Sequence, residues 1–403
     1  MYIMSIITLT NKQEEVVMRA VEWWNKDIKK VFTIAGLAGT GKSTIIKFIT
    51  SAINLNDEQV VYSAYTGTAT NVLNRKGNNN TSTIHRLMYN VVYDEKKNKF
   101  NFIKKESISK NIKLIIVDEG SMVTDSMIEE LITFNVPIIM IGDPMQLPPV
   151  KGGINKYMKR PDIFLDEPLR QALDNPIIWL ANEVRKKNRL RIGPIDENVM
   201  IINKKDVDYD MYTGADQILA SKNITVDRIN SLIRKNILNL NSPFPYVGEK
   251  LICLKNNWLE MYEDNGSQQY LTNGIIGYVE NIYEYKKRLD TFELDFKPTF
   301  SSDTGIYNRL HVDALYFTDG ITNDDQIYEN EMYKSLILRR NIFEESHVII
   351  NKFKFGYATT VYKSQGSEYD NVLLFDEIYN KSIYHQQLYT GITRAKTNLI
   401  IAL

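Results

Sequence analysis

The stretch that decides the fold of this chain is GLAGTGKS, residues 36–43. It is a full match to the pattern G-x-x-x-x-G-K-[ST], with an apolar, β-branched run at 31–35 before it and a helical pattern from Ser43 onward. A strand, a glycine-rich loop and a helix are the context that this pattern requires. The glycines let backbone N–H groups approach phosphate oxygens, and the helix N-terminus adds a partial positive charge. We therefore predict a nucleoside-triphosphate site, and the flanking elements argue against a chance glycine turn.

Two side chains of this loop have defined chemical roles. Lys42 is expected to reach the β- and γ-phosphates, and the Ser43 hydroxyl is expected to hold Mg²⁺. The predicted nucleotide-binding residues of the loop are Gly36, Ala38, Gly39, Thr40, Gly41, Lys42, Ser43 and Thr44.

The composition is that of a globular protein. The chain has 403 residues, which is enough for two or three domains with real cores. Its single cysteine, Cys253, excludes an internal disulfide and is typical of a reducing compartment, and its four histidines lack metal-ligand spacing. The N-terminal MYIMSIITLT lacks the features of a signal peptide, and no apolar run approaches the roughly 20 residues of a membrane helix. We expect a cytoplasmic protein with no membrane partner, in the host cytoplasm if the source is a phage.

Charge is balanced overall but uneven along the chain. A net charge of zero argues against a histone-like DNA binder, although local asymmetry still allows nucleic-acid binding. Residues 151–191 carry ten Lys and Arg against five Asp and Glu, whereas residues 281–345 carry eight against thirteen. The acidic stretch is therefore the poorer candidate for gripping a phosphate backbone.

Four apolar runs before residue 150 predict a parallel sheet. They cover residues 31–35, 60–64, 114–117 and 136–141, with helical segments between them. This alternation is typical of a doubly wound α/β domain, in which ligands bind at the carboxyl ends of the strands. The residues at those ends, which we expect to face one crevice, are Gly36, Thr66, Asp118 and Asp143.

The rest of the chain alternates between two patterns. Residues 89–103, with aromatic and β-branched arms around a polar turn, predict a β-hairpin inserted in the first sheet domain. Residues 243–350 contain short strand-like runs separated by Gly, Asn and Asp, which predict a small all-β insertion. The α/β pattern then returns, with a strand predicted at 355–360, a helix from 360 and another helix at 384–395.

Polar side chains follow two of the apolar runs. Asp118 can hold Mg²⁺, and Glu119 can polarise an attacking water; a solvated turn is the alternative for this pair. Gln146 lies in GDPMQLPP, residues 142–149, and its amide suits sensing of the γ-phosphate. A rigid proline-rich turn with a capping Asp explains the same residues equally well.

Taken together, these motifs resemble a superfamily 1 DNA helicase of the RecD-like and Dda-like branch, superfamily 1B. The resemblance rests on GLAGTGKS, DEGSM (118–122), GDPMQLPPV (142–150), TSTIH (81–85), YATTVYKSQGS (357–367) and LYTGITRAK (388–396). It implies an α/β fold of two RecA-like P-loop domains with parallel sheets, a small β-hairpin insertion and an all-β SH3-like insertion. The implied boundaries are 1–165 for the first motor domain with its hairpin at 87–110, 166–242 and 351–403 for the second, and 243–350 for the all-β insertion.

Three positions depart from the family pattern. Tyr65 replaces the proline common in the segment 64–69, Gly120 replaces Ala or Val, and Tyr362 replaces a frequent histidine. None of the three removes a phosphate or metal ligand. They concern the details of DNA contact more than ATP hydrolysis.

The resemblance also implies nucleotide contacts outside the loop. Gln13 matches the glutamine that reads adenine, although an exposed helix residue is the alternative. Gln365 and Gly366 match positions that face the nucleotide. Arg170 and Arg394 match arginines that reach the γ-phosphate from the second motor domain. The predicted catalytic residues are Lys42, Asp118, Glu119, Gln146, Arg170 and Arg394, the predicted metal ligands are Ser43 and Asp118, and the predicted cofactors are ATP and Mg²⁺. Other arginines, which lack this context and are interpreted as surface charges, are Arg228, Arg234, Arg339 and Arg340.

DNA contacts are implied in both motor domains and in the hairpin. The residues expected to face the DNA backbone are Thr66, Thr83, His85, Thr359, Thr360 and Ser364. For His85, a helix-capping or core histidine is the alternative. Phe100 and Phe102 can stack on bases or wedge a fork, and simple packing of the hairpin is the alternative.

The sequence thus predicts an ATP-dependent DNA helicase that moves 5′ to 3′ on single-stranded DNA. Its expected partners are single-stranded DNA and a duplex fork, with single-stranded-DNA-binding or replisome proteins as further candidates, and a monomer is expected. Replication, repair and recombination are all open as settings. Two other functions stay open: an RNA helicase or ribonucleoprotein remodeller, and an ATP-gated subunit of a nuclease complex that does not unwind DNA.

Overall fold

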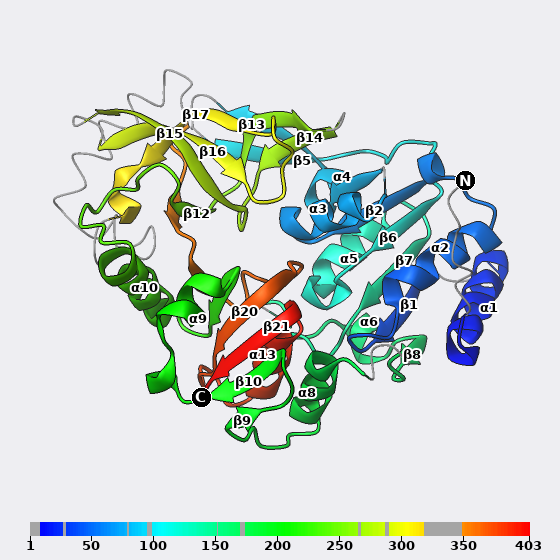
Figure 1. Cartoon of the computed structure of the whole chain (residues 1–403). Coiled ribbons are helices and arrows are strands. Elements are labelled where there is room, and N and C mark those ends of the chain that lie inside the picture. The colour runs from blue at the N-terminus through cyan, green and yellow to red at the C-terminus, as the bar shows by residue number, and fades with distance from the viewer. Residues whose placement is uncertain are drawn as a thin grey trace, which may run out of the picture.

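The described part of the chain forms two largely parallel sheets, one antiparallel sheet and two isolated strand pairs (Figure 1). The structure is a computed structural model. It describes residues 9–26, 30–78, 80–94, 99–150, 152–169, 174–264, 267–286, 290–317 and 349–403. Within these ranges, no helix has both the length and the apolar character needed to cross a bilayer.

The first sheet has the strand order β3-β2-β6-β7-β1-β8, and every pair is parallel. Its strands are β1 Val31–Gly36, β2 Val60–Ala64, β3 Thr81–Thr83, β6 Leu114–Val117, β7 Ile138–Gly142 and β8 Ile163–Leu165. Four of the strands are buried along their whole length, which explains their continuous apolar sequence. The predicted doubly wound sheet is confirmed, with the three-residue strands β3 and β8 added at its edges.

Helices cover both faces of the first sheet. They are α1 Asn11–Lys26, α2 Lys42–Ala52, α3 Gly67–Arg75, α4 Ile84–Met88, α5 Asp125–Ile132 and α6 Lys156–Lys159. Side chains of α1, α2 and α3 pack with Ile34 and Ile116 on one face. Those of α4, α5 and α6 pack with Ile115 and Met140 on the other face. The strand ends that carry the predicted motifs therefore lie at one edge of a rigid, two-sided core.

The second sheet has the order β19-β11-β20-β21-β10-β9 and is parallel except for the β9–β10 pair. Its strands are β9 Gly193–Pro194, β10 Val199–Ile202, β11 Gln217–Ala220, β19 Ala358–Thr360, β20 Tyr369–Phe375 and β21 Ala395–Ala402. The helices that flank it are α8 Pro176–Arg185, α9 Tyr209–Gly214, α10 Asn223–Leu232 and α13 Tyr384–Ile392. α8 and α13 pack on one face with Leu374 and Ile401, and α9 and α10 pack on the other with Leu373.

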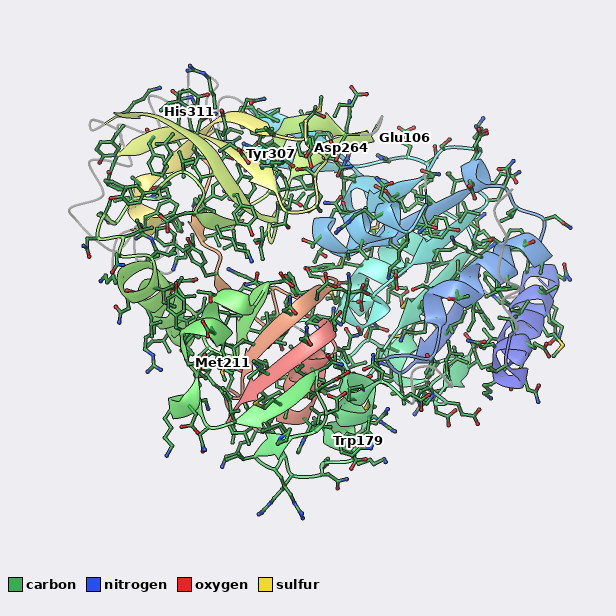
Figure 2. All side chains as sticks on the ribbon, viewed as in Figure 1. Glu106, Trp179, Met211, Asp264, Tyr307 and His311 are labelled. Carbon is green, nitrogen blue, oxygen red and sulfur yellow. The ribbon has the colours of Figure 1, made fainter. Side chains whose placement is uncertain are left out.

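The third sheet, β17-β16-β15-β12-β18, is antiparallel and forms most of the all-β part. Its strands are β12 Lys250–Cys253, β15 Ile276–Lys286, β16 Thr291–Pro298, β17 Tyr307–Asp313 and β18 Phe353–Phe355, and the separate pair is β13 Asn257–Asp264 with β14 Ser267–Leu271. Aromatic rings fill its core; Tyr307, labelled in Figure 2, lies inside it and is 1% exposed. Figure 1 shows this part beside both parallel sheets, so the predicted all-β insertion is confirmed.

The strand predicted at 355–360 is wrong in detail, because two strands occupy that stretch. β18 pairs with β12 in the antiparallel sheet, whereas β19 pairs with β11 in the second parallel sheet. The chain changes sheets at Gly356, whose N–H donates to the Lys250 carbonyl. The helix predicted from residue 360 is also wrong, since residues 361–366 form turns.

Arg234 is not a surface charge. Its side chain is 5% exposed, and its Nε and Nη2 donate to the two Glu249 carboxylate oxygens at 2.7 and 3.0 Å. The other guanidinium bonds go to the carbonyls of Ser242 and Phe244, and the group lies 3.8 Å above the Phe355 ring. This satisfied ion pair joins the end of α10 to the all-β part. Arg228 is exposed as expected, while Arg339 and Arg340 lie outside the described residues.

Candidate nucleotide and DNA site

The loop between β1 and α2 has the backbone shape that its sequence predicts. Gly39 and Gly41 both have φ +76°, a region that residues with a Cβ rarely adopt. A Cβ on Gly41 would also lie 2.6 Å from Gln13 Nε2. Lys42 begins α2, and its Nζ donates to the carbonyls of Gly36 and Leu37 at 2.7 and 2.8 Å. The carbonyl oxygens of the loop therefore hold the Lys42 ammonium group against the loop itself.

Gln13 is part of the loop's support. It is 3% exposed, its Nε2 donates to the Thr40 carbonyl at 3.0 Å, and its Oε1 accepts from the Thr10 N–H at 3.0 Å. The alternative of an exposed helix residue is therefore wrong. The side chain ties α1 to the loop, and its position beside Gly41 is compatible with the predicted adenine contact.

The two acids after β6 lie in a tight, half-buried turn. Asp118 Oδ1 accepts from the Glu119 N–H at 2.8 Å. Glu119 has φ +50°, an uncommon value for a residue other than glycine. Burial raises the pKa of both carboxyls, and the nearby charges of Lys42 and Arg394 oppose this rise at Asp118 and Glu119 respectively. Raised pKa values and an uncommon backbone make the pair a candidate for the predicted catalytic role.

Gln146 connects these acids to the second sheet. With its amide nitrogen toward Glu119 Oε2 and its amide oxygen toward Arg394 Nη2, both distances are 3.3 Å. Arg394 is 4% exposed, and its Nε and Nη1 donate to the carbonyls of Thr390 and Ser367 at 3.1 and 3.0 Å. The structure thus brings Glu119, Gln146 and Arg394 together from two sheets. Arg170 lies outside the described residues.

Gln365 and Gly366 lie between the two sheets rather than at the glycine loop. Gln365 Nε2 donates to the Leu147 carbonyl at 2.9 Å, and the side chain is 2% exposed. The Gly366 backbone lies against Ala69 of α3, where an added Cβ would be 2.6 Å from the Ala69 Cβ. Both positions pack the second sheet against the first.

Tyr389, which the sequence motifs did not single out, lies on α13 and is 2% exposed. Its hydroxyl accepts from the Ala38 N–H at 2.9 Å and donates to Asp143 Oδ2 at 2.6 Å. The neighbouring Thr390 Oγ1 accepts from the Leu147 N–H at 2.9 Å. The sequence did offer one signal for Tyr389, since it is a tyrosine within LYTGITRAK, residues 388–396, the motif that also carries Arg394.

A groove of about 490 Å³ runs along the edge where the two parallel sheets meet the all-β part. Thr66, Thr83 and His85, the DNA contacts expected in the first domain, line it, and the two threonines also cap α3 and α4 through their Oγ1 atoms. Further lining residues that the sequence did not single out are Trp258, Thr272, Pro148, Pro149 and Lys363. Hydroxyl, imidazole and ammonium groups of this kind suit contact with a phosphate backbone.

Three predicted DNA contacts do not line this groove. Thr359, Thr360 and Ser364 are 2%, 9% and 0% exposed, and the Ser364 Oγ donates to the Val361 carbonyl. The turns at 361–366 direct Lys363 into the groove instead. Thr359 and Thr360 lie in strand β19, and Ser364 lies in the turns that follow it, so all three side chains face the interior here. Their contact with DNA stays a prediction.

The hairpin carries a row of rings on one face. β4 Tyr89–Asp94 pairs with β5 Lys99–Lys104, so Phe100 lies opposite Tyr93, with ring centres 5.3 Å apart. Phe102, 47% exposed, lies 6.2 Å from Tyr89 and 6.5 Å from His85. His85 packs within this row, and burial lowers its pKa, which favours the neutral ring. The row leads from the groove onto the hairpin.

Comparisons with known proteins find helicases over nearly the whole chain. One family model, described as an AAA domain, matches residues 8–202, and another, described as a UvrD-like helicase C-terminal domain, matches residues 355–402. The "ATP-dependent DNA helicase dda" of Enterobacteria phage T4 is 26% identical over 94% of this chain and 95% of its own length. The "RecBCD enzyme subunit RecD" of Buchnera aphidicola is 27% identical over 93% of this chain and 70% of its own.

Solved structures extend the likeness of fold. Pif1 helicase from Candida albicans aligns with a TM-score of 0.52 at 17% identity, over 98% of this chain and 94% of that one. Pif1 helicase from Bacteroides in complex with ADP-AlF3 and single-stranded DNA aligns with a TM-score of 0.54 at 17% identity, over 98% and 93% of the two chains.

These relatives support a superfamily 1B helicase. The resemblance drawn from the motifs is confirmed, as is the α/β fold class with additional β-sheets.

The three departures from the superfamily 1B pattern have different structural settings. Tyr65 and Tyr362 both line the groove, so they change its wall and not the nucleotide loop. Gly120 lies where a Cβ would be 2.5 Å from Met140 Cγ and 3.0 Å from the Ile141 carbonyl oxygen. The side chain of Met140 on β7 therefore requires glycine at this position.

We predict that Gly120→Ala lowers the free energy of unfolding by about 1–3 kcal/mol, because the added methyl overpacks the site. The matched control is Gly214→Ala, at a glycine with no atom within 4 Å of the added Cβ, where the change should stay within about 0.5 kcal/mol. Urea unfolding measures both. In a Met140→Ala background, Gly120→Ala should cost less stability than it does in the wild type, because the side chain that the new methyl meets has been removed. Wild-type stability of Gly120→Ala would contradict the close approach.

Proposed function

We propose that this protein uses ATP hydrolysis to move 5′ to 3′ along single-stranded DNA and to unwind duplex DNA, as a helicase of superfamily 1B. One observation carries the proposal. Glu119 and Gln146 of the first sheet meet Arg394 of the second, beside a groove that both sheets line. A site assembled from two bodies can be made and broken by their relative motion, and the same motion changes the groove. The T4 relative is named as an ATP-dependent DNA helicase.

The loop residues hold the triphosphate in this proposal. Lys42 exchanges its bonds with the loop carbonyls for phosphate oxygens, and the backbone N–H groups of residues 39–43 surround the phosphates. Ser43 and Asp118 line one cavity of about 230 Å³, and their oxygen atoms are donors that suit Mg²⁺. When bound there, Mg²⁺ neutralises phosphate charge. Gln13 contacts adenine from its place beside Gly41.

Hydrolysis uses the residues between the two sheets. Glu119 accepts the proton of the attacking water, and Gln146 positions that water against the γ-phosphate. Arg394 stabilises the charge that develops on the phosphoryl oxygens, and Arg170 adds a second positive charge in the predicted arrangement. Closure of the two sheet domains completes this set, and opening after hydrolysis releases it.

DNA is held by groups without sequence preference. Thr66, Thr83 and His85 hold the backbone on the first domain, and Lys363 holds it on the second. Alternating grip by the two domains moves the strand. We propose domains at 1–165, 166–242 with 356–403, and 243–355. The last boundary differs from the sequence-based one because β18 pairs with β12.

The finer features of the activity are also proposals. The protein acts as a monomer in a cytoplasmic compartment, with single-stranded-DNA-binding or replisome proteins as candidate partners. One relative is named as a subunit of the RecBCD enzyme, which keeps the non-unwinding subunit as the second candidate.

We predict that the chain alone unwinds a duplex with a 5′ single-stranded tail and leaves a duplex with a 3′ tail intact. Strand displacement on the two labelled duplexes measures this. An RNA tail in place of the DNA tail is the control for an RNA helicase. Unwinding that requires the 3′ tail would reject the direction, and efficient unwinding only from the RNA tail would reject DNA as the substrate. ATPase activity without any unwinding would favour the subunit function.

We predict that Phe100→Ala/Phe102→Ala loses much of the unwinding and keeps DNA-stimulated ATPase. Stacking of a base on an aromatic ring is worth about 1–3 kcal/mol, enough to link stepping to strand separation. The matched control is Val92→Ala/Ile103→Ala on the opposite face of the same hairpin, where both side chains are exposed. The control should unwind normally. If the phenylalanine variant loses unwinding, ATPase and melting temperature together, the rings only pack the hairpin.

A further inference from the structure

One hydroxyl of the second sheet domain contacts two strand ends of the first. The Tyr389 hydroxyl, on α13, accepts from the Ala38 N–H at 2.9 Å and donates to Asp143 Oδ2 at 2.6 Å. Ala38 belongs to the loop after β1, and Asp143 follows β7, the strand next to β1 in the sheet. The glycine loop and the segment that leads to Gln146 therefore meet at this one atom.

The ring and the hydroxyl of Tyr389 have separable roles. The ring is 2% exposed and packs in the core of the second domain with Leu388 and Ile392. The hydroxyl is the ring's only polar atom, and it is used both as donor and as acceptor. Burial beside Asp143 raises the Tyr389 pKa well above its usual value, so the hydroxyl keeps its proton. A phenylalanine would preserve the packing and remove only the two bonds.

Asp143 depends on this bond. Its side chain is 0% exposed, and the other carboxylate oxygen accepts from the Met145 N–H at 2.9 Å. A buried carboxylate that loses a donor is left with an unsatisfied acceptor, and the surrounding turn must shift or admit water to compensate. Gln146 follows in the same turn, and its N–H donates to the Asp143 carbonyl. A shift of Asp143 therefore moves the residue that faces Glu119.

The helix that carries Tyr389 also positions Arg394. Arg394 Nε donates to the Thr390 carbonyl at the end of α13, and Thr390 Oγ1 accepts from the Leu147 N–H. Arg394 and Gln146 thus each connect to the same turn of this helix, which is fixed to the glycine loop through the Tyr389 hydroxyl. Alignment of Arg394, Gln146 and Glu119 depends on where α13 lies against the loop.

We propose that Tyr389 is a positioning residue. It fixes where the second domain docks against the ATP site when the two domains close. Its hydroxyl holds the loop at Ala38 and the turn at Asp143 against α13, and this brings Arg394 and Gln146 into line with Glu119. The inference rests on the proposed ATP hydrolysis. Because the bonds join two domains, they contribute to the closed, reactive arrangement and not to the capture of nucleotide by the loop itself.

The test is the ATPase of Tyr389→Phe with saturating single-stranded DNA. Loss of a hydrogen bond to a charged acceptor should lower kcat about tenfold and leave KM for ATP within about twofold. The matched control is Tyr384→Phe on the same helix. Its hydroxyl donates to Asp376 at 2.8 Å, another Tyr–Asp bond but one inside the second domain. This control should keep the wild-type kcat, and both variants should lose melting temperature to a similar small extent, because each removes one Tyr–Asp hydrogen bond.

A second comparison tests whether Tyr389 acts through Asp143. If it does, the double variant Asp143→Asn/Tyr389→Phe should have a kcat only slightly below that of the less active single variant. A wild-type kcat in Tyr389→Phe, or equal losses of kcat in Tyr389→Phe and Tyr384→Phe, would overturn the inference while the wild-type activity stands. A wild-type chain without ATPase would overturn both the inference and the proposed function.

Discussion

The candidate site depends on one contact. The turn after β7 of the first sheet domain packs into the core of the second domain. Leu147 belongs to the turn after β7, yet it is 0% exposed in the core formed by α8, α13 and the second sheet. Its burial contributes about 1.5–3 kcal/mol. Its N–H and carbonyl bond to Thr390 and Gln365 of the second domain. The turn that carries Gln146 is therefore packed in both domains. A movement of the second domain must displace this turn, and with it the residues beside the nucleotide loop.

Backbone strain and buried charge are both concentrated at the strand ends next to this turn. Glu119 has a left-handed backbone, and Asp118, Glu119 and Asp143 all have pKa values raised by burial. Lys42 and Arg394 supply the nearby positive charge. Such an arrangement is costly by itself, and it persists because the strands on either side are fully buried and rigid. The rest of the fold, including the satisfied Arg234–Glu249 pair, holds the β-rich part of the groove in place around it.

The sequence was most informative where local chemistry requires a pattern. Buried parallel strands give continuous apolar runs, and a phosphate loop requires glycines followed by Lys42, so both were predicted. Three-residue strands such as β8 carry too little pattern to be recognised. The burial of Arg234, the direction of Thr359 and Ser364, and the contact of Tyr389 with Ala38 were not predictable, because each depends on residues far away in the chain. The roles of the individual site residues, Arg170 among them, stay predictions.

The most direct test of the account is the ATPase rate of wild type and Lys42→Ala, each with and without single-stranded DNA. The account requires that DNA stimulates the wild-type rate, since the groove and the ATP site share the same two domains. It also requires that Lys42→Ala loses turnover while its melting temperature stays close to wild type, because the lysine's bonds in this structure are to its own loop. Turnover by Lys42→Ala at the wild-type rate, or a wild-type rate that DNA leaves unchanged, would contradict it.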